Sequence, residues 1–176
     1  MIRPYRGRTP RLGARVYVDE QAALIGDVTL GDDASIWPMA SVRGDVQRIE
    51  IGARTNVQEN AVLHVTHDGP YSPGGGPLLI GDDVTIGHGV ILHACSIGDR
   101  CLIGMGAIIM DRAVLEDGCF IAAGAMVPPG KVLKGGWLYR GSPAQPAREL
   151  SPQEREQLLY SAHHYVRIKN HYLESP

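Results

Sequence analysis

Four of the seven histidines lie between positions 64 and 93, and their spacing is typical of a metal site. His64 follows Val-Leu and His93 follows Ile-Leu, so each imidazole comes directly after an aliphatic pair. His88 lies five residues before His93, and His67 lies three residues after His64. Three imidazoles with one open position form a catalytic type of zinc site. His64, His88 and His93 are therefore candidate metal ligands.

A six-residue repeat predicts the elements that must position these histidines. A helix repeats at about 3.6 residues and a strand at 2, so neither accounts for the period. We expect short strands joined by tight corners, three to a turn of a triangular prism, with the repeated aliphatic residues inside. The repeat is interrupted before Ile51, at 64–79 and before Ile97, and its positions are Leu12, Val18, Leu24, Leu30, Ile36, Val42, Ile51, Val57, Leu63, Ile80, Ile86, Leu92, Ile97, Ile103, Ile109, Leu115, Ile121, Val127 and Leu133.

Stacked turns of such a prism lie about 4.8 Å apart, the spacing of strands in a sheet. Following the faces along the chain places His64 and His93 one turn apart on one outer face, in line with Arg43. Two imidazoles so placed can bind one ion. His88 falls on another face, together with Gln58, and cannot easily reach that ion within one prism. A neighbouring prism could supply His88, and three prisms related by a cyclic axis would form a homotrimer.

The overall composition excludes several classes of protein. The 17 basic and 19 acidic residues give a formal charge of −2, which argues against a nucleic-acid or membrane-surface partner. No apolar run approaches the roughly 20 residues of a membrane span, and no secretory signal is evident. Three cysteines are too few for a disulfide scaffold. We therefore expect a cytoplasmic protein.

The repeat divides the chain into two regions. Residues 1–140 are predicted to form the β-helix, with a metal-site loop at 64–79, and residues 141–176 a connector and a C-terminal helix packed on it. Residues 135–150 are expected to be irregular. Ser151-Pro152-Gln153-Glu154 is a capping box with proline at the first helical position, which predicts a helix from about Pro152 to Leu173. The predicted fold class is all-β with one terminal helix.

The motifs around the histidines resemble those of the γ-class carbonic anhydrases: Arg43-Gly44-Asp45, Asn56-Val57-Gln58-Glu59, Leu63-His64 and Gly87-His88-Gly89-Val90-Ile91-Leu92-His93. The likeness covers nearly the whole chain and is greatest to short, single-domain bacterial members, some of which are labelled ferripyochelin-binding. It implies a left-handed parallel β-helix of hexapeptide repeats. It also implies a homotrimer in which His64 and His93 of one subunit share a metal ion with His88 of its neighbour.

The resemblance assigns roles to the other polar residues. Arg43 and Asp45 match a pair implicated in the interface and in bicarbonate or active-site organisation. A purely structural ion pair between subunits is the alternative for them. Gln58 matches the residue that hydrogen-bonds the metal-bound water, and Asn56 and Glu59 match polar positions nearby.

The implied reaction is the reversible hydration of CO2 to bicarbonate by a metal-bound hydroxide. Three neutral imidazoles suit Zn²⁺, and Fe²⁺ or Co²⁺ equally.

Two departures from the family pattern concern proton transfer. Val46 stands where a glutamate usually follows the arginine–aspartate motif, and residues 65–78 contain no glutamate to act as proton shuttle. His67 and Asp68 are possible substitutes, because imidazole titrates near neutral pH. Glu59 is another if it faces the metal. Slow proton export would then make the enzyme weak.

Two other functions fit the repeat. A hexapeptide acyltransferase that uses acyl-CoA would share the prism but typically employs one histidine as general base. A non-catalytic metal-binding or scaffold protein would keep the ion only as a clamp between subunits.

Overall fold

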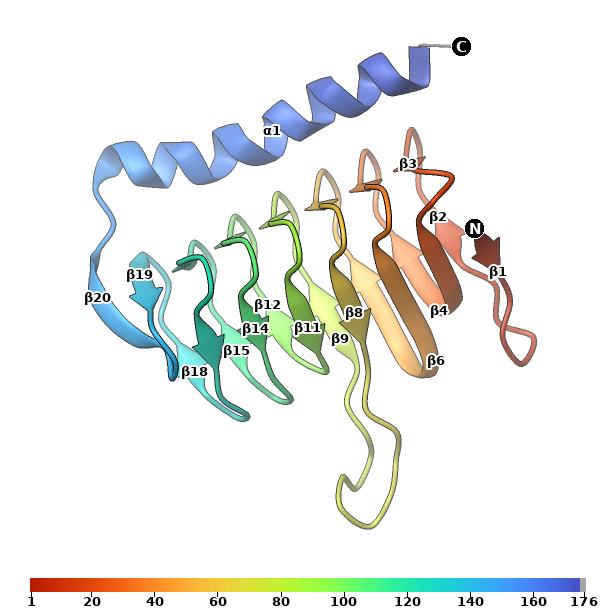
Figure 1. Cartoon of the computed structure of the whole chain (residues 1–176), viewed down its shortest axis with the longest axis horizontal. Helices are drawn as coiled ribbons and strands as arrows, with labels where there is room; N and C mark the ends of the chain where they lie inside the picture. Colours follow the sequence, from red (N-terminus) through yellow and green to blue (C-terminus); the bar gives the residue numbers. More distant parts are fainter. Residues whose placement is uncertain (175–176) are drawn as a thin grey trace.

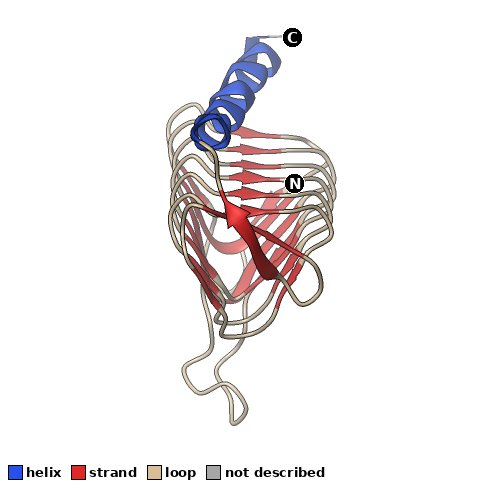
Figure 2. Cartoon of the chain, turned by 90° about the vertical axis from the view of Figure 1, so that its left-hand side faces the viewer, coloured by secondary structure: helices blue, strands red, loops and turns tan. Residues whose placement is uncertain are grey.

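The computed structural model describes residues 1–174 as a parallel β-solenoid of about eight turns with one C-terminal helix. Figure 1 shows the turns stacked along the long axis, and Figure 2 shows their triangular cross-section. The predicted prism and terminal helix are confirmed. No helix in the described part of the chain is long and apolar enough to span a membrane.

The strands of residues 1–174 form two sheets. One contains twelve strands: β1 (Ile2–Arg3), β2 (Arg11–Leu12), β4 (Ala23–Leu30), β6 (Ser41–Ile51), β8 (Val62–His64), β9 (Leu78–Ile80), β11 (Ile91–His93), β12 (Ser96–Ile97), β14 (Ile108–Ile109), β15 (Val114–Leu115), β17 (Met126–Val127) and β18 (Val132–Leu133). The other contains eight: β3 (Tyr17–Val18), β5 (Ser35–Ile36), β7 (Asn56–Val57), β10 (Thr85–Ile86), β13 (Leu102–Ile103), β16 (Phe120–Ile121), β19 (Trp137–Arg140) and β20 (Gln145–Glu149).

The long strands β4 and β6 bend around a corner and so join two faces of the prism. We call the face of β8, β11, β14 and β17 face A, that of β9, β12, β15 and β18 face B, and the eight-stranded sheet face C. At the bend a Cβ atom on Gly26 would lie 2.4 Å from the carbonyl oxygen of Gly44. Glycine at position 26 therefore lets β4 and β6 stack at the corner of the prism, next to Arg43 and Asp45.

The repeated aliphatic residues form the core, in register from turn to turn. Leu63 pairs with Leu92 on face A and Val57 with Ile86 on face C, and all four side chains are fully buried. Leu12, with 43% of its surface exposed, and the partly buried Val18 are the exceptions, because both lie in the end turn. A single turn cannot enclose its aliphatic side chains, so burial requires stacked neighbours.

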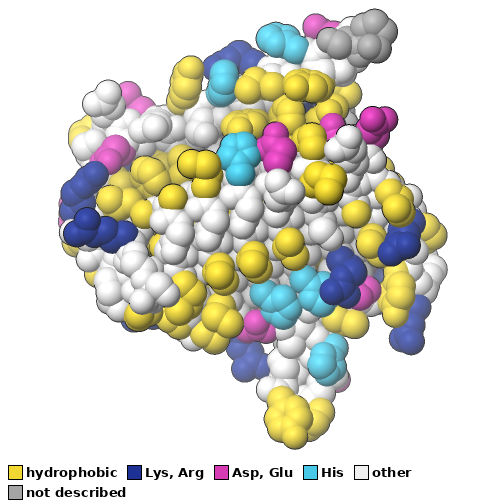
Figure 3. All heavy atoms as spheres, in the orientation of Figure 1, with side chains coloured by type: hydrophobic (Ala, Val, Ile, Leu, Met, Phe, Trp, Pro, Cys, Tyr) yellow, Lys and Arg dark blue, Asp and Glu magenta, His cyan; other side chains and the backbone are white. Residues whose placement is uncertain are grey.

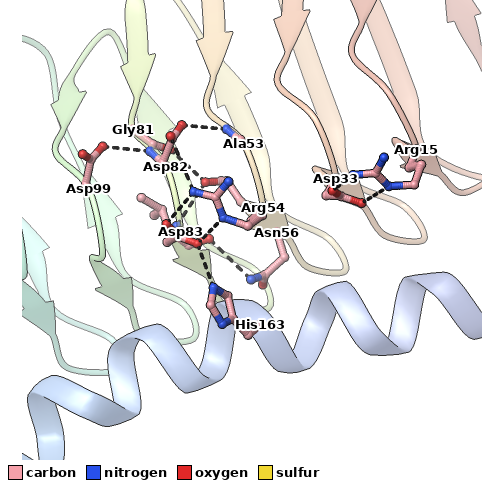
Figure 4. Close-up of polar contacts among 12 residues, drawn as sticks. Arg15, Asp33, Ala53, Arg54, Asn56, Gly81, Asp82, Asp83, Asp99 and His163 are labelled. Atoms are coloured by element: carbon pink, nitrogen blue, oxygen red, sulfur yellow. Dashed lines mark hydrogen bonds and ion pairs between the residues drawn. The ribbon is translucent and has the colours of Figure 1, made fainter.

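A ladder of aspartates at one corner explains the glycines that follow Ile80 and Ile97. Asp82 accepts a hydrogen bond from the backbone of Ala53 at 2.8 Å, and Asp99 accepts one from the backbone of Asp82 at 2.9 Å (Figure 4). A Cβ atom on Gly81 would lie 2.2 Å from the Asp99 carboxylate, so only glycine leaves room for this contact.

The predicted irregular connector is more regular than expected. β19 and β20 form an antiparallel pair within residues 135–150, where the prolines and Gly141 suggested only turns. The pairing gives the last edge of face C a partner strand. The next element, α1 (Pro152–Glu174), begins with the predicted capping box, because Ser151 and Glu154 exchange hydrogen bonds between side chain and backbone.

Helix α1 runs back along face C from the β19 end toward β3 (Figures 1 and 2). His163 contacts Asp83 at 3.3 Å beside the bidentate pair of Arg54 with Asp83 (Figure 4). Lys169 is fully buried, and its Nζ lies 2.9 Å from Asp33. These polar contacts fix the helix on the sheet.

We predict that Lys169→Ala destabilises the fold by about 1–3 kcal/mol, because it removes a hydrogen-bond donor from the nearly buried carboxylate of Asp33. Hydrogen bonds from Arg15 outweigh burial and lower the pKa of Asp33, and Lys169 contributes to this. The stability from this carboxylate is therefore present above its unfolded pKa and lost as the pH falls. Urea unfolding at fixed protein concentration measures the effect, with the exposed Lys131→Ala as control. Equal midpoints for both variants would contradict the prediction.

Candidate metal centre

The register between β8 and β11 places His64 directly beside His93, as the face assignment predicts. His64 Nδ1 and His93 Nε2 lie 3.2 Å apart, and the ring centroids 5.2 Å apart. Each side chain is partly exposed on face A, with 20% and 38% of its surface accessible. The pair is thus open to a ligand from outside the prism.

In each ring, the outer nitrogen, which faces away from the other ring, lies within hydrogen-bond distance of a carboxylate. Asp45 Oδ1 lies 3.0 Å from His64 Nε2, and Asp111 Oδ1 lies 2.7 Å from His93 Nδ1. An ionised carboxylate only accepts hydrogen bonds, so both outer nitrogens carry protons. The two inner nitrogens of neutral rings then turn lone pairs toward each other, which is unfavourable unless a proton or a cation lies between them.

The donor set of this pair fits a divalent metal ion. Two nitrogens bound to one tetrahedral zinc at about 2.0–2.1 Å lie roughly 3.3 Å apart, close to the separation between these rings. Carboxylates behind metal-binding imidazoles are the usual means of fixing their tautomer. His64 and His93 therefore have the chemistry and the spacing of two metal ligands.

Burial and charge favour neutral imidazole and ionised carboxylate here. Burial lowers the pKa of His64 below its usual value, although the hydrogen bond to Asp45 opposes this. Burial would raise the pKa values of Asp45 and Asp111, but hydrogen bonds outweigh it and lower both. The donors are His64 and Arg43 for Asp45, and Thr66 and His93 for Asp111. Neutral imidazole is the form that binds metal.

His88 follows β10 on face C, away from the pair. Its Nδ1 lies 2.6 Å from Glu59 Oε2, so a third imidazole also has a carboxylate partner. Glu59, rather than Gln58, is therefore the residue stacked against His88. Within residues 1–174 of one chain, no three His, Cys, Asp or Glu side chains converge to hold a metal ion.

The remaining polar candidates form two networks. Arg43 is ion-paired with Asp45 of the same chain. Gln58 Nε2 donates to Asn56 Oδ1 at 3.0 Å, and Asn56 Nδ2 donates to Thr85 Oγ1 at 3.2 Å. The Thr85 hydroxyl, in turn, donates to Ser161 of α1 at 3.0 Å. The amide nitrogen of Gln58 is thus engaged inward.

His67 is exposed in the loop between β8 and β9. It lines two cavities. Asp45 also lines the first cavity, of about 550 Å³, and Asp111 also lines the second, of about 300 Å³. His67 therefore shares one cavity with each of the two carboxylates that hold the paired histidines.

Comparison with known proteins identifies the family. A family model described as bacterial transferase hexapeptide (six repeats) matches residues 94–129. Protein YrdA from Escherichia coli (strain K12) is 52% identical, covering 99% of this chain and 95% of that one. A solved hexapeptide transferase family protein from Anaplasma phagocytophilum has a TM-score of 0.91 and 41% identity, covering 98% of both chains. A carbonic anhydrase from Geobacillus kaustophilus is 44% identical, covering 98% of this chain and 91% of that one. The chain belongs to the γ-class carbonic anhydrase family.

Asp111 and Thr66 of this γ-class family member were missed by the sequence analysis. Asp111 lies 18 residues after His93, but this turn spans only 17 residues, because the repeat loses one residue before Ile97 and Leu92 pairs with Ile109. The repeat would therefore have placed Met110, not Asp111, at the level of His93. Thr66 carries no signal either, because it lies inside the loop that interrupts the repeat.

We predict that Thr85→Val destabilises this γ-class family member by about 1–2 kcal/mol, because it removes the hydroxyl between Asn56 and Ser161. Ser161→Ala interrupts the same chain from α1. Since both changes affect one network, the double variant should lose less stability than the sum of the single losses. Urea unfolding of the four proteins measures this. Strictly additive losses would show that Thr85 and Ser161 are not coupled.

Proposed function

We propose that this protein is a metal-dependent lyase of the γ-carbonic anhydrase type that hydrates CO2 reversibly to bicarbonate. The observation that carries the proposal is the pair of facing imidazole nitrogens, 3.2 Å apart, with a carboxylate behind each ring. A carbonic anhydrase relative that spans almost the whole chain supports the same reaction. The cytoplasmic location and the left-handed sense of the coil, both expected from the sequence, belong to this proposal.

The proposed metal ligands are His64 and His93 of one subunit and His88 of a neighbouring copy. Zn²⁺ is the proposed cofactor, with Fe²⁺ or Co²⁺ as alternatives. A divalent ion in such a site lowers the pKa of water in its open position and supplies a nucleophile near neutral pH. Asp45 holds the His64 ring, and Glu59 holds the His88 ring, which makes orientation the proposed role of Glu59.

Two surface features support a homotrimer. Val62, Ile91 and Ile108 are exposed in register on face A, and the partly buried Met126 extends their row. Figure 3 shows histidine side chains beside hydrophobic ones on the face that it views. His88 lies on face C, so pairing face A of one copy with face C of the next would complete the site. Such a head-to-tail contact closes under cyclic symmetry.

Gln58 and Arg43 are proposed to act on the substrate side. The amide nitrogen of Gln58 is bound by Asn56, which leaves its carbonyl oxygen to accept a hydrogen bond from water. Arg43 is partly exposed and already neutralises Asp45, so it can orient an anionic product such as bicarbonate. Because Arg43 and Asp45 pair within one chain, their contact does not itself require the neighbouring copy.

The proposed route for the released proton runs through His67, which shares cavities with both Asp45 and Asp111. Imidazole exchanges protons efficiently near neutral pH. The loop that carries His67 has no glutamate, and Glu59 is engaged with His88.

Stopped-flow CO2 hydration on zinc-loaded protein tests the proposed function, with His64→Ala as the matched control. We expect measurable hydration by the wild type and its loss in the variant, because the variant retains only one imidazole of the pair. Activity that is equal in both proteins would contradict the assigned site. A metal-loaded wild type without activity would favour the scaffold alternative.

We predict that His67→Ala lowers kcat for hydration, and that added imidazole buffer partly restores it. The chemical step should be spared, because His67 contacts neither paired histidine. Glu59→Gln serves as comparison, since its expected defect is weaker metal binding without rescue by buffer. An unchanged buffer dependence in His67→Ala would contradict the shuttle.

A hexapeptide acyltransferase is the second candidate, because a similar structure is named a hexapeptide transferase family protein. The structure offers a mostly apolar groove of about 650 Å³ between α1 and face C, with His88 and Gln58 among its lining residues. A thermal-shift titration with acetyl-CoA separates the two functions. Stabilisation by acetyl-CoA at micromolar concentration would favour the transferase, and its absence the lyase.

A further inference from the structure

We propose that Asp111, held in place by Thr66, is the positioning residue that fixes the ring of His93 and thereby sets the metal affinity of the centre. The inference rests on the proposed metal site and adds a determinant that lies outside the sequence motifs. It concerns which nitrogen of His93 is presented to the ion.

Both oxygens of the Asp111 carboxylate are engaged. Oδ1 lies 2.7 Å from His93 Nδ1, and Oδ2 accepts a hydrogen bond from the Thr66 hydroxyl. Asp111 follows β14, Thr66 follows β8, and His93 ends β11 between them, so three successive turns meet at this carboxylate. A carboxylate fixed by two partners cannot rotate away from the imidazole.

The carboxylate determines the tautomer of His93. Because ionised Asp111 only accepts, Nδ1 must be the protonated nitrogen, and the lone pair of the neutral ring then lies on Nε2. Nε2 is the atom that faces His64. Without Asp111 the ring is free to adopt the other tautomer or to turn, and a ligand that must first be reoriented binds metal more weakly.

Thr66 and Arg112, which flank this carboxylate in space and in sequence, also anchor the loop between β8 and β9. Thr66 exchanges backbone hydrogen bonds with Gly76 at the base of the loop, at 3.0 and 2.9 Å. Arg112, the neighbour of Asp111, donates to the Ser72 hydroxyl at 2.9 Å. Asp111 could therefore act on His93 directly or only through the position of this loop, and the two roles are separable by mutation.

Arg112→Ala is the matched control for that separation. It removes the contact with Ser72 but keeps the carboxylate and its bonds to His93 and Thr66. Asp111→Ala removes the acceptor altogether. Asp111→Asn keeps the shape and one acceptor oxygen but removes the charge. Thr66→Val removes the hydroxyl that braces the carboxylate and that also lies 3.4 Å from His93 Nδ1.

The experiment is a titration of metal-free protein with Zn²⁺ in competition with a chromophoric chelator. Asp111→Ala should weaken zinc binding about 10- to 100-fold, the usual cost of losing a partner behind a metal ligand. Asp111→Asn and Thr66→Val should lose less, and Arg112→Ala should bind as the wild type does. Thermal unfolding of the metal-free variants identifies any that fail to fold, and the absorption bands of Co²⁺-loaded Asp111→Asn should shift, because ligand geometry changes.

The outcomes separate this inference from the proposed function. If the wild type binds no zinc, the proposed metal site itself fails. If the wild type binds zinc and folded Asp111→Ala and Asp111→Asn bind it equally well, Asp111 is not a positioning residue. If Arg112→Ala weakens zinc binding as much as Asp111→Ala does, Asp111 acts only through the loop and the inference is overturned.

Discussion

In-register pairing between successive turns is the constraint on which the rest of the structure depends. Leu63 and Leu92 stack inside face A, and the residue that follows each of them must then project outward at the same level. His64 and His93 occupy these positions and meet at 3.2 Å between nitrogens. A shift of one residue in either turn would move one imidazole into the core and its leucine out of it, at the cost of buried aliphatic surface. The hydrophobic core therefore enforces the geometry of the polar site.

Carboxylates fix the orientation of the imidazoles that the stacked turns put in place. Each of the three candidate imidazoles has its own acidic partner: Asp45 for His64, Glu59 for His88 and Asp111 for His93. These partners come from the bend in β6, the corner after β7 and the corner after β14. Placing the acids at corners leaves the strand interiors to the aliphatic repeat. The outer nitrogens are thus protonated, and the remaining lone pairs are available to a cation.

Much of this arrangement follows from the repeat. The period of six residues predicts the solenoid, the adjacency of His64 and His93 and the separate face of His88, because stacking turns spacing in sequence into position. Asp111 was not predictable from the repeat, because the turn after His93 is one residue short and places Met110, not Asp111, at the level of that histidine. The repeat also overestimates regularity at the end turn, where Leu12 has no further turn to cover it.

Other features depend on contacts that periodicity does not encode. The bond between Glu59 and His88 depends on side-chain conformations at a corner. The pairing of Arg43 with Asp45 in one chain depends on the bend of β6, where a glycine and its neighbours set the direction of the strand. The β19–β20 hairpin forms because the last edge of face C needs a partner, although its prolines and glycines suggested an irregular segment.

The central claim is that two imidazoles on face A are completed by His88 of another copy, and mixing two inactive variants tests it most directly. His64→Ala damages face A and His88→Ala damages face C, so neither pure assembly should hold an intact site. In a mixed trimer one interface of three joins two intact faces. Random equimolar co-refolding gives three quarters mixed trimers, so about a quarter of the sites should recover zinc. Recovery near that fraction is the predicted result. No recovery, with mixed trimers demonstrated by mass spectrometry, would contradict a site shared between chains.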